Sequence, residues 1–299
     1  MTLHVIEAGL RSTIQDRGRI AHLRSAIPAA GPADPLAFEA AQRLVGNDPS
    51  DAAVEIVGLP FRFTLDAPRL VAVTGRDIRL RTRGPIQGWT SAFVRAGEEA
   101  TVEGGERSRF AYLAISGGIA VEPVLGSRAT YLPAAIGPIP RALAAGDALP
   151  LGPARRGAEA AGHGALRSDD REILVLRGPH SDRIAGADAL LRGRPYRVSE
   201  RSDRMGVRLE GPALDAGGTE ILSIGVLPGA VQVPHGGEPI VLLADGQTTG
   251  GYPVVASVVS VDLGRVAQAI PGEALSFYEV DRAAALEAVR AVRRWLERL

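Results

Sequence analysis

The sequence predicts a mainly β protein, folded as barrels or sandwiches rather than around a parallel α/β sheet. Short apolar runs recur along the 299 residues, and many of the 36 glycines and 21 prolines separate them. Segments with helical periodicity are few. Short strands bounded by Gly and Pro at this spacing are typical of all-β folds. The length is that of about two domains.

The first half contains most of the expected strands. They cover residues 3–7, 53–59, 61–65, 69–73, 89–96, 99–102 and 110–115. One helix interrupts them: Asp34 is placed to cap it, Pro35 suits its first position, and Gly46 ends it. If Asp34 caps this helix its carboxylate is already used, and a catalytic role for Asp34 is the alternative.

Residues 152–170 are small and charged with little apolar periodicity, the composition of a surface linker. We therefore expect an N-terminal β-barrel domain over residues 1–152, a linker over 153–170 and a C-terminal β-barrel domain over 171–299. His163 lies in the linker between glycines and is expected to be solvated and uninvolved.

The second half begins with a strand at residues 173–176. A short helix is expected over residues 179–191 with Ser181 as its N-cap, and another over 262–270. The last segment, residues 281–299, predicts an amphipathic helix that packs on its domain. Its expected apolar face contains Leu286, Val289, Val292, Leu296 and Leu299.

The two halves contain similar short segments in the same order. Residues 16–18 (DRG) resemble 203–206 (DRMG), and residues 69–75 (RLVAVTG) resemble 239–246 (PIVLLADG). Each match is weak alone, but together they favour two related β domains with the ligand site in a crevice between them.

Composition excludes several classes of function. Net charge is zero, so neither nucleic acid nor a membrane surface is an expected partner. All 34 basic residues are arginine, which excludes a Schiff-base lysine, a phosphate-loop lysine and a biotinyl-lysine on this chain. Cysteine is absent. With neither a signal peptide nor an 18-residue apolar run in view, we expect a soluble cytoplasmic protein.

Motifs of conventional catalysis are also missing. The five histidines are scattered and no HExxH pattern occurs, so no metal site is expected. Neither GxSxG nor GxxxxGK[ST] is present. The SGG at residues 116–118 is too short to indicate a phosphate-binding loop.

The most informative stretch is the polar loop at residues 244–253 (ADGQTTGGYP), between strand-like runs at 239–244 and 254–261. It gathers five polar side chains around two glycines: Asp245, Gln247, Thr248, Thr249 and Tyr252. Loops held by rigid strands are common places for binding groups. The alternative is an ordinary hairpin turn whose polar groups satisfy their own backbone.

Other polar segments offer further candidates. The turn at residues 125–130 is expected to expose Ser127, Arg128 and Thr130. Arg204 and Arg128 are suited to hold a carboxylate or phosphate, and the Gln and Thr side chains of the polar loop to orient an amide. Three aspartates could assist proton transfer or simply pair with a neighbouring arginine: Asp16, Asp203 and Asp245.

Nearly the whole chain resembles the KipA / allophanate hydrolase subunit 2 family. The segments that carry the resemblance are residues 9–18 (GLRSTIQDRG), 31–34 (GPAD), 44–47 (LVGN), 112–130 with SGGI and LGSRAT, 204–206 (RMG), 229–234 (GAVQVP) and 239–253, ending in QTTGGYP. Two positions depart from it: Ala129 stands where the family often has Ser, and Gly246 where Arg is common.

The resemblance implies two tandem cyclophilin-like β-barrel domains and a role as one component of an ATP-dependent 5-oxoprolinase complex. The expected partners are a KipI-type subunit, a LamB/YcsF-type subunit, and a small amide substrate, with ATP shared with a partner. Together with the chemistry above, it indicates Asp16, Asp34, Arg204 and Gln247 as catalytic residues. It indicates Gln15, Arg128, Gln232, Thr248, Thr249 and Tyr252 as substrate-binding residues.

Two other functions stay open at this point. A related branch of the family transfers a carboxyl group from carboxybiotin to urea, and this chain could use a biotin carried by another protein. The family also implies a third candidate, a non-catalytic regulator that binds a KipI-type partner.

Overall fold

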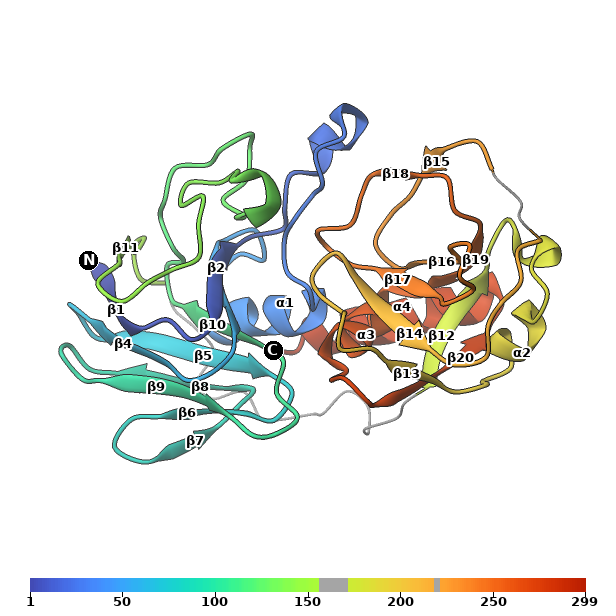
Figure 1. The fold of residues 1–299 in the computed structure, drawn as a ribbon. Helices are drawn as coiled ribbons and strands as arrows, with labels where there is room; N and C mark the ends of the chain where they lie inside the picture. The colour runs from blue at the N-terminus through green and yellow to red at the C-terminus, as the bar shows by residue number, and fades with distance from the viewer. Residues whose placement is uncertain (156–171, 218–220) are drawn as a thin grey trace. The chain divides into compact units, whose positions relative to one another are not determined.

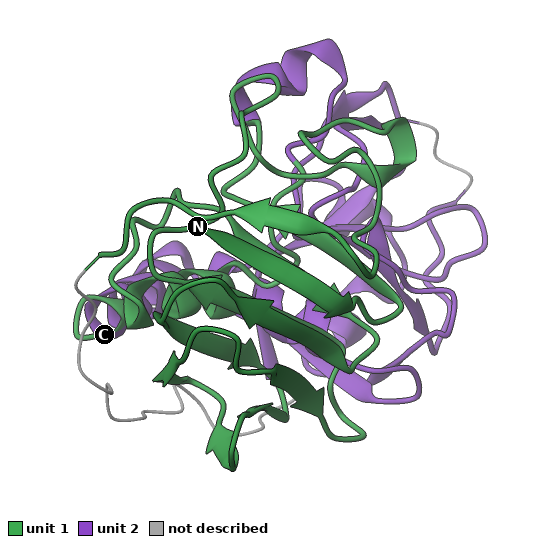
Figure 2. Cartoon of the chain, turned by 90° about the vertical axis from the view of Figure 1, so that its left-hand side faces the viewer, with its two compact units in different colours: residues 1–19, 30–165, 296–299 green, residues 20–29, 166–295 purple. Residues whose placement is uncertain are grey.

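The computed structural model describes residues 1–155, 172–217 and 221–299. The chain divides into two compact units, coloured separately in Figure 2. Among the described residues, unit 1 contains 1–19, 30–155 and 296–299, and unit 2 contains 20–29, 172–217 and 221–295. The predicted linker, with His163, lies almost wholly outside the described residues, so the boundaries 153–170 stay a prediction.

Unit 1 is built from two antiparallel sheets (Figure 1). The six-stranded sheet has the order β11-β1-β4-β9-β6-β7, and the five-stranded sheet the order β2-β3-β10-β5-β8. The strands are β1 (Thr2–Glu7), β2 (Arg11–Gln15), β3 (Ala53–Val57), β4 (Phe61–Leu65), β5 (Arg69–Gly75), β6 (Ile78–Arg81), β7 (Pro85–Gln87), β8 (Thr90–Val94), β9 (Ala100–Gly104), β10 (Phe110–Ile115) and β11 (Ala148–Pro150). A short 3-10 helix, η2 (Leu132–Ala134), lies in the segment between β10 and β11.

Strand β10 is buried at all six positions because both its faces are covered. Ala111, Leu113 and Ile115 belong to the apolar core of unit 1. The other face meets helix α1 (Pro35–Leu44), where the Phe38 and Tyr112 rings pack edge to face at 6.0 Å. This arrangement explains why the strand is a continuous apolar run instead of an alternating one.

Unit 2 contains a closed barrel with the strand order β12-β19-β16-β17-β14-β13-β20. Parallel pairing of β12 with β20 completes it, while the other pairs are antiparallel. The strands are β12 (Glu172–Arg177), β13 (Tyr196–Val198), β14 (Gly206–Glu210), β16 (Ala230–Gln232), β17 (Ile240–Leu242), β19 (Val254–Val258) and β20 (Ala274–Glu279). A separate ribbon pairs β15 (Ile224–Gly225) with β18 (Thr249–Gly250). The predicted mainly β fold with a barrel is confirmed.

The helices of unit 2 are short apart from the last. They are η1 (Ile20–Ser25), η3 (Ser181–Arg183), α2 (Ala187–Leu191), η4 (Ser260–Asp262), α3 (Leu263–Gln268) and α4 (Arg282–Leu296). The prediction of one helix over 179–191 capped by Ser181 was wrong. Gly186 takes a left-handed conformation with φ of +85° and separates η3 from α2, and the Ser181 hydroxyl donates to the Gly178 carbonyl instead of capping.

Helix α4 confirms the predicted C-terminal helix but not its whole apolar face. Its buried residues are Ala285, Trp295 and Leu296, whereas Leu286 is 42% exposed. The buried stripe therefore passes through Ala285 and Leu296, which lie eleven positions apart on one face with Val289 and Val292 half-buried between them, instead of through Leu286.

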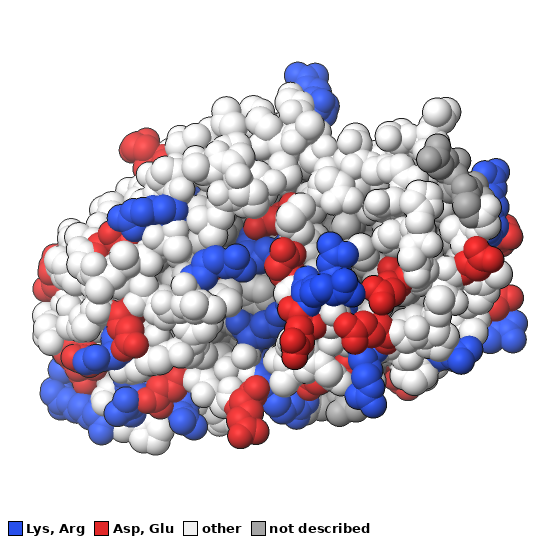
Figure 3. Space-filling view, viewed as in Figure 1, with Lys and Arg blue, Asp and Glu red and all other residues white. Residues whose placement is uncertain are grey.

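None of the described helices has both the length and the apolar composition required to span a membrane. On the face of the molecule in Figure 3, arginine and acidic side chains lie interspersed, in agreement with a net charge of zero.

Candidate functional site

The polar loop of unit 2 runs outside the barrel, between β17 and β19. Thr249 and Gly250 form β18, which pairs with β15, and the Thr248 carbonyl accepts from the Val226 N–H at 2.9 Å. Part of the loop's backbone therefore has hydrogen-bond partners within the protein, as the hairpin interpretation expects. The side chains of Gln247, Thr249 and Tyr252 nevertheless remain at least partly exposed and available to a ligand.

Beneath this loop, two glutamine amides are joined. Gln247 Nε2 donates to Gln232 Oε1 at 2.9 Å. Gln232 is 1% exposed and ends β16, where it pairs with Ile240 on one side and Val254 on the other. Its Nε2 is buried and has no hydrogen-bond partner among the described residues. The structure therefore brings Gln232 and Gln247 together and leaves one buried amide group unsatisfied.

Two histidines border the same loop, and the sequence offered no signal for either. The His235 and Tyr252 rings pack edge to face at 6.0 Å. His180 Nδ1 accepts from the Val254 N–H at 3.1 Å, so the neutral imidazole carries its proton on Nε2. The two histidines lie far apart in the chain, and only the folding of the barrel brings both next to this loop.

Arg204 and Asp245 form a buried bidentate ion pair. Arg204 Nε donates to Asp245 Oδ2 at 2.8 Å and Nη2 to Oδ1 at 2.9 Å, with side chains only 6% and 5% exposed. The guanidinium edge that was expected to hold a carboxylate or phosphate is occupied by Asp245. This is the internal pairing that the sequence left open for Asp245. Asp203, also a candidate, is exposed and accepts from the N–H groups of Met205 and Gly206.

In unit 1, Asp16 organises the turn at residues 125–130. Asp16 Oδ1 accepts from the Ser127 hydroxyl at 2.6 Å and from the Gly18 N–H at 2.8 Å, and Oδ2 accepts from the Arg128 N–H at 2.5 Å. The prediction that this turn exposes Ser127 and Thr130 was wrong, since each is 1% exposed. Their hydroxyls are used inside the protein, where Thr130 donates to the Ile139 carbonyl.

Arg128 is half-buried in the same turn, and its Nε donates to the Val121 carbonyl at 2.6 Å. Next to the turn, Gln15 is completely buried at the end of β2. Gln15 Nε2 donates to the Thr13 hydroxyl and to the Thr130 carbonyl. Its Oε1 has no partner among the described residues. Unit 1 therefore also holds a buried amide with one unsatisfied atom.

Asp34 caps helix α1 as predicted: its Oδ1 accepts from the Ala37 N–H at 3.0 Å. A buried carboxylate that the sequence analysis did not single out lies beside it. Glu55 Oε2 accepts from the Ala33 N–H and from the Tyr112 hydroxyl, and that hydroxyl accepts from the Asp34 N–H at 2.7 Å. The signal was a glutamate in the middle of an apolar strand, AVEIV.

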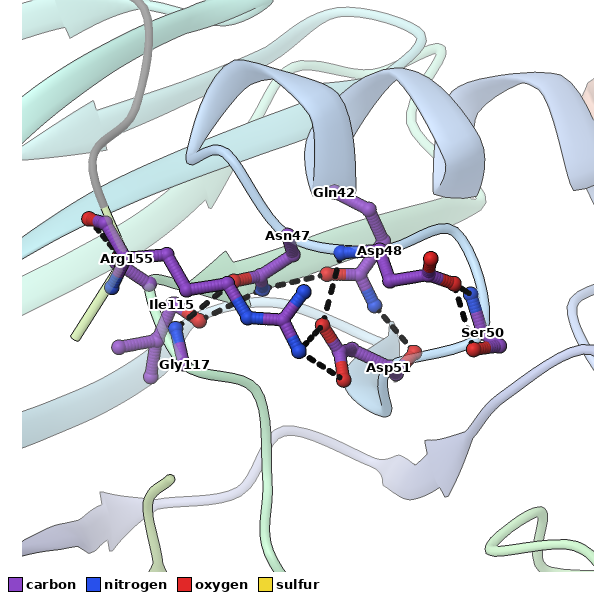
Figure 4. Close-up of polar contacts among 9 residues, drawn as sticks. Gln42, Asn47, Asp48, Ser50, Asp51, Ile115, Gly117 and Arg155 are labelled. Atoms are coloured by element: carbon purple, nitrogen blue, oxygen red, sulfur yellow. Dashed lines mark hydrogen bonds and ion pairs between the residues drawn. The ribbon is translucent and has the colours of Figure 1, made fainter. Parts of the chain in front are cut away.

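The LVGN and SGG segments fit together, as Figure 4 shows. Asn47 Nδ2 donates to Gln42 Oε1 and to the Ile115 carbonyl, and Asn47 Oδ1 accepts from the Gly117 N–H, all at 2.8 Å. The Gly118 N–H donates to Ile115 as well. These segments thus join α1 to the end of β10.

Among residues 1–155, 172–217 and 221–299, no three His, Asp or Glu side chains are grouped so as to hold a metal ion. Each unsatisfied amide has polar neighbours in its own unit: Gln247 beside Gln232 in unit 2, and Thr13 beside Gln15 in unit 1. Amides and hydroxyls of this kind suit recognition of a planar amide through directed hydrogen bonds.

Comparison with known proteins identifies the family. Residues 25–279 match the family model described as "Carboxyltransferase domain, subdomain A and B". The chain belongs to the carboxyltransferase-domain family. It is 39% identical to the C subunit of 5-oxoprolinase from Escherichia coli, across 99% of this chain and 97% of the relative. It is 33% identical to the C subunit of 5-oxoprolinase from Haemophilus influenzae, across 93% and 91% respectively.

A solved structure agrees with this carboxyltransferase-domain assignment. The urea amidolyase of K. lactis matches with a TM-score of 0.90 and 26% identity, covering 99% of this chain but 20% of that chain. The resemblance drawn from the segments between residues 9 and 253 is thereby confirmed. The match also shows that the same fold occurs as one part of a much longer enzyme.

Proposed function

We propose that this chain is the C subunit of an ATP-dependent 5-oxoprolinase, which binds the cyclic amide 5-oxoproline and helps to activate it for ring opening to glutamate. One observation carries the proposal. The match to the E. coli C subunit extends over 99% of this chain and 97% of the relative at 39% identity. Urea amidolyase relatives are less similar, and this chain covers only 17% of the one from Lachancea kluyveri.

Unit 2 supplies the chemistry for holding a lactam. A lactam presents one N–H donor and one carbonyl acceptor in a plane, and side-chain amides present the complementary pair. Gln247 is exposed, with Thr248, Thr249 and Tyr252 close to it in the chain. The buried Arg204–Asp245 pair holds the start of the loop in place. In this proposal Arg204 positions the loop and does not bind the substrate itself.

Unit 1 has a polar group of its own. Asp16 Oδ2 accepts from the Arg128 N–H, so it fixes the backbone position from which the Arg128 side chain extends. Gln15 Oε1 is a buried acceptor suited to an amide N–H. Asp34 is engaged as a helix cap, and in the proposal it orders the start of α1.

Neither the SGG segment nor Arg204 fits ATP by itself. The N–H groups of Gly117 and Gly118 donate to Asn47 and Ile115 within the chain. The Arg204 fork is occupied by Asp245. We therefore assign ATP binding mainly to a KipI-type partner, and derive no step through the nucleotide here. A LamB/YcsF-type partner would complete the complex.

Reconstitution with both partner proteins tests the proposal. We expect glutamate release from 5-oxoproline that requires ATP and all three proteins. Gln247→Ala should lower kcat/KM by about tenfold or more, because one directed amide contact is lost. Gln87→Ala is the matched control, since Gln87 is an exposed glutamine on strand β7 at the end of its sheet. A reconstituted complex that releases no glutamate would refute the proposal.

A second candidate is a carboxyltransferase acting on urea or a similar amide. The family model's description and the fold shared with K. lactis urea amidolyase favour it. The chain contains no lysine, so biotin would have to be carried by another protein. This function would be favoured if urea were turned over only in the presence of a carboxybiotin carrier, while 5-oxoproline and ATP gave no glutamate.

A further inference from the structure

The side-chain amide of Gln232 has a hydrogen-bonding group that its own surroundings leave unsatisfied. Gln232 is 1% exposed, and its Oε1 accepts from Gln247. Its Nε2 has no partner among the described residues. Folded proteins pair the large majority of buried N–H groups, and each exception needs a reason. Here the exception lies directly under the loop that is proposed to bind an amide.

Gly250 covers this unsatisfied group. A Cβ atom added at Gly250 would lie 2.6 Å from Gln232 Nε2, so the glycine backbone packs against the amide. Gly250 belongs to β18, a two-residue strand paired with the two-residue β15 in a ribbon separate from the barrel. Segments held by so few backbone pairs open at a lower free energy than barrel strands do.

Gln232 itself is held rigidly. It lies in β16 between β17 and β19, and Gln247 fixes the plane of its amide. The donor is therefore preorganised, while its cover is a two-pair ribbon that opens more easily than the barrel strands. A preorganised buried donor favours a ligand that brings a strong acceptor, because the unpaired group is then satisfied.

We propose that Gln232 Nε2 donates a hydrogen bond to the ring carbonyl oxygen of a cyclic amide, which reaches it when the Thr249–Gly250 strand moves aside. Gly250 is the residue that lets the cover close, since a side chain there would crowd Nε2 in the closed form. The choice of a lactam as the ligand rests on the proposed function. The unsatisfied donor and its glycine cover are observed in the structure whatever the ligand is.

Binding of lactams to the full chain tests the inference. The probes are 5-oxoproline, 2-pyrrolidone and proline, which has the ring but lacks the ring carbonyl. Gln232→Glu keeps an oxygen that accepts from Gln247 but removes the donor. By calorimetry we expect this variant to bind both lactams about tenfold or more weakly than the parent chain. In the ¹⁵N-labelled chain, the side-chain amide signals that Gln232→Glu removes should shift when either lactam is added, and proline should leave them in place.

Two adjacent glycines provide a matched pair that does not alter Gln232. Neither Gly250 nor Gly251 has a left-handed backbone, so alanine fits both conformations. The nearest atom to an added Cβ is 2.6 Å away at Gly250 but 3.5 Å away at Gly251, an ordinary contact. Because the added Cβ crowds Gln232 Nε2 only while the cover is closed, Gly250→Ala should favour the open form and strengthen lactam binding about threefold or more, whereas Gly251→Ala should bind within about twofold of the parent.

The inference is overturned if the parent chain binds no lactam, if Gln232→Glu binds as tightly as the parent, or if Gly250→Ala binds lactams no more tightly than Gly251→Ala. Glutamate release separates this result from the proposed function. Lactam binding that depends on Gln232, in a complex that releases no glutamate, refutes the 5-oxoprolinase proposal alone. Turnover of 5-oxoproline that Gln232→Glu leaves unchanged refutes the inference alone.

Discussion

Asp16 and Ser127 lie 111 positions apart in the chain, yet the Ser127 hydroxyl donates to the Asp16 carboxylate at 2.6 Å. The same carboxylate accepts from the N–H groups of Gly18 and Arg128. One buried carboxylate therefore ties two segments of unit 1 together: residues 16–18 and the turn at residues 125–130.

Asp16→Asn should destabilise the protein by about 2 kcal/mol, because hydrogen bonds to a buried charged acceptor are worth more than neutral ones. Urea unfolding measures the loss. Asp203→Asn is the control, since Asp203 also accepts from two backbone N–H groups but is exposed. Equal losses of unfolding free energy in the two variants would show that the hydrogen bonds of buried Asp16 contribute no more than those of an exposed aspartate.

Arg204→Ala should cost about 3–5 kcal/mol of unfolding free energy, because it leaves Asp245 buried without its counter-ion. Replacing both residues together, Arg204→Met with Asp245→Leu, should recover much of this loss in a thermal or urea unfolding experiment. Arg201→Ala should change stability by less than about 1 kcal/mol, since Arg201 and Glu238 form an exposed pair. A double variant no more stable than Arg204→Ala would contradict this account.

Asn47→Ala should cost about 2–3 kcal/mol, because it removes three hydrogen bonds that join α1 to the end of β10. Hydrogen exchange should show faster opening at Gly117, whose N–H loses its acceptor. Ser50→Ala, on the exposed side of the same network in Figure 4, should change stability by less than about 0.5 kcal/mol. An unchanged exchange rate at Gly117 would count against this role for Asn47.

Asp147 predicts a pH-dependent contribution to stability. The hydrogen-bonded Arg141 guanidinium, assisted by the Ala144 N–H, holds the pKa of Asp147 below its usual value. A carboxylate with a lowered folded-state pKa stabilises the protein above its unfolded pKa of about 4, and this is lost as pH falls through the folded value. Asp147→Asn should therefore be about 1 kcal/mol less stable at pH 7.

That difference should shrink as the pH is lowered below about 4, and urea unfolding at pH 7 and pH 3 measures it. Asp182→Asn is the control, because Asp182 is 92% exposed and lies 3.7 Å from its arginine. A constant difference between Asp147→Asn and the parent chain at both pH values would rule out this titration.

Local signals predicted much of the fold. Strands β4 and β10 begin and end at the predicted residues, and α1 begins after Asp34 and ends before Gly46. Such elements depend on apolar runs and capping residues that are neighbours in the chain. The helix expected over residues 179–191 failed because one glycine in a left-handed conformation divides it, which composition alone does not reveal.

The candidate site could be predicted only as a set of residue types. The sequence singled out Gln232 and Gln247, but nothing in it shows that their amides meet or that Nε2 is left over. It also placed Ser127 and Thr130 at the surface, because a turn rich in small polar residues is usually exposed. In the structure the turn is buried, and its Ser127 hydroxyl and Arg128 N–H donate to Asp16, which lies in a distant part of the chain.

The sequence by itself determined the mainly β class, the capped helix α1, the absence of lysine and cysteine, and the segments that mark the carboxyltransferase-domain family. Tertiary structure alone decided which polar groups are already satisfied: Asp16 by Ser127, Arg204 by Asp245, and Gln232 only in part. The physical reason is that elements form from neighbouring residues, whereas the partners of a buried polar group come from strands and loops far along the chain.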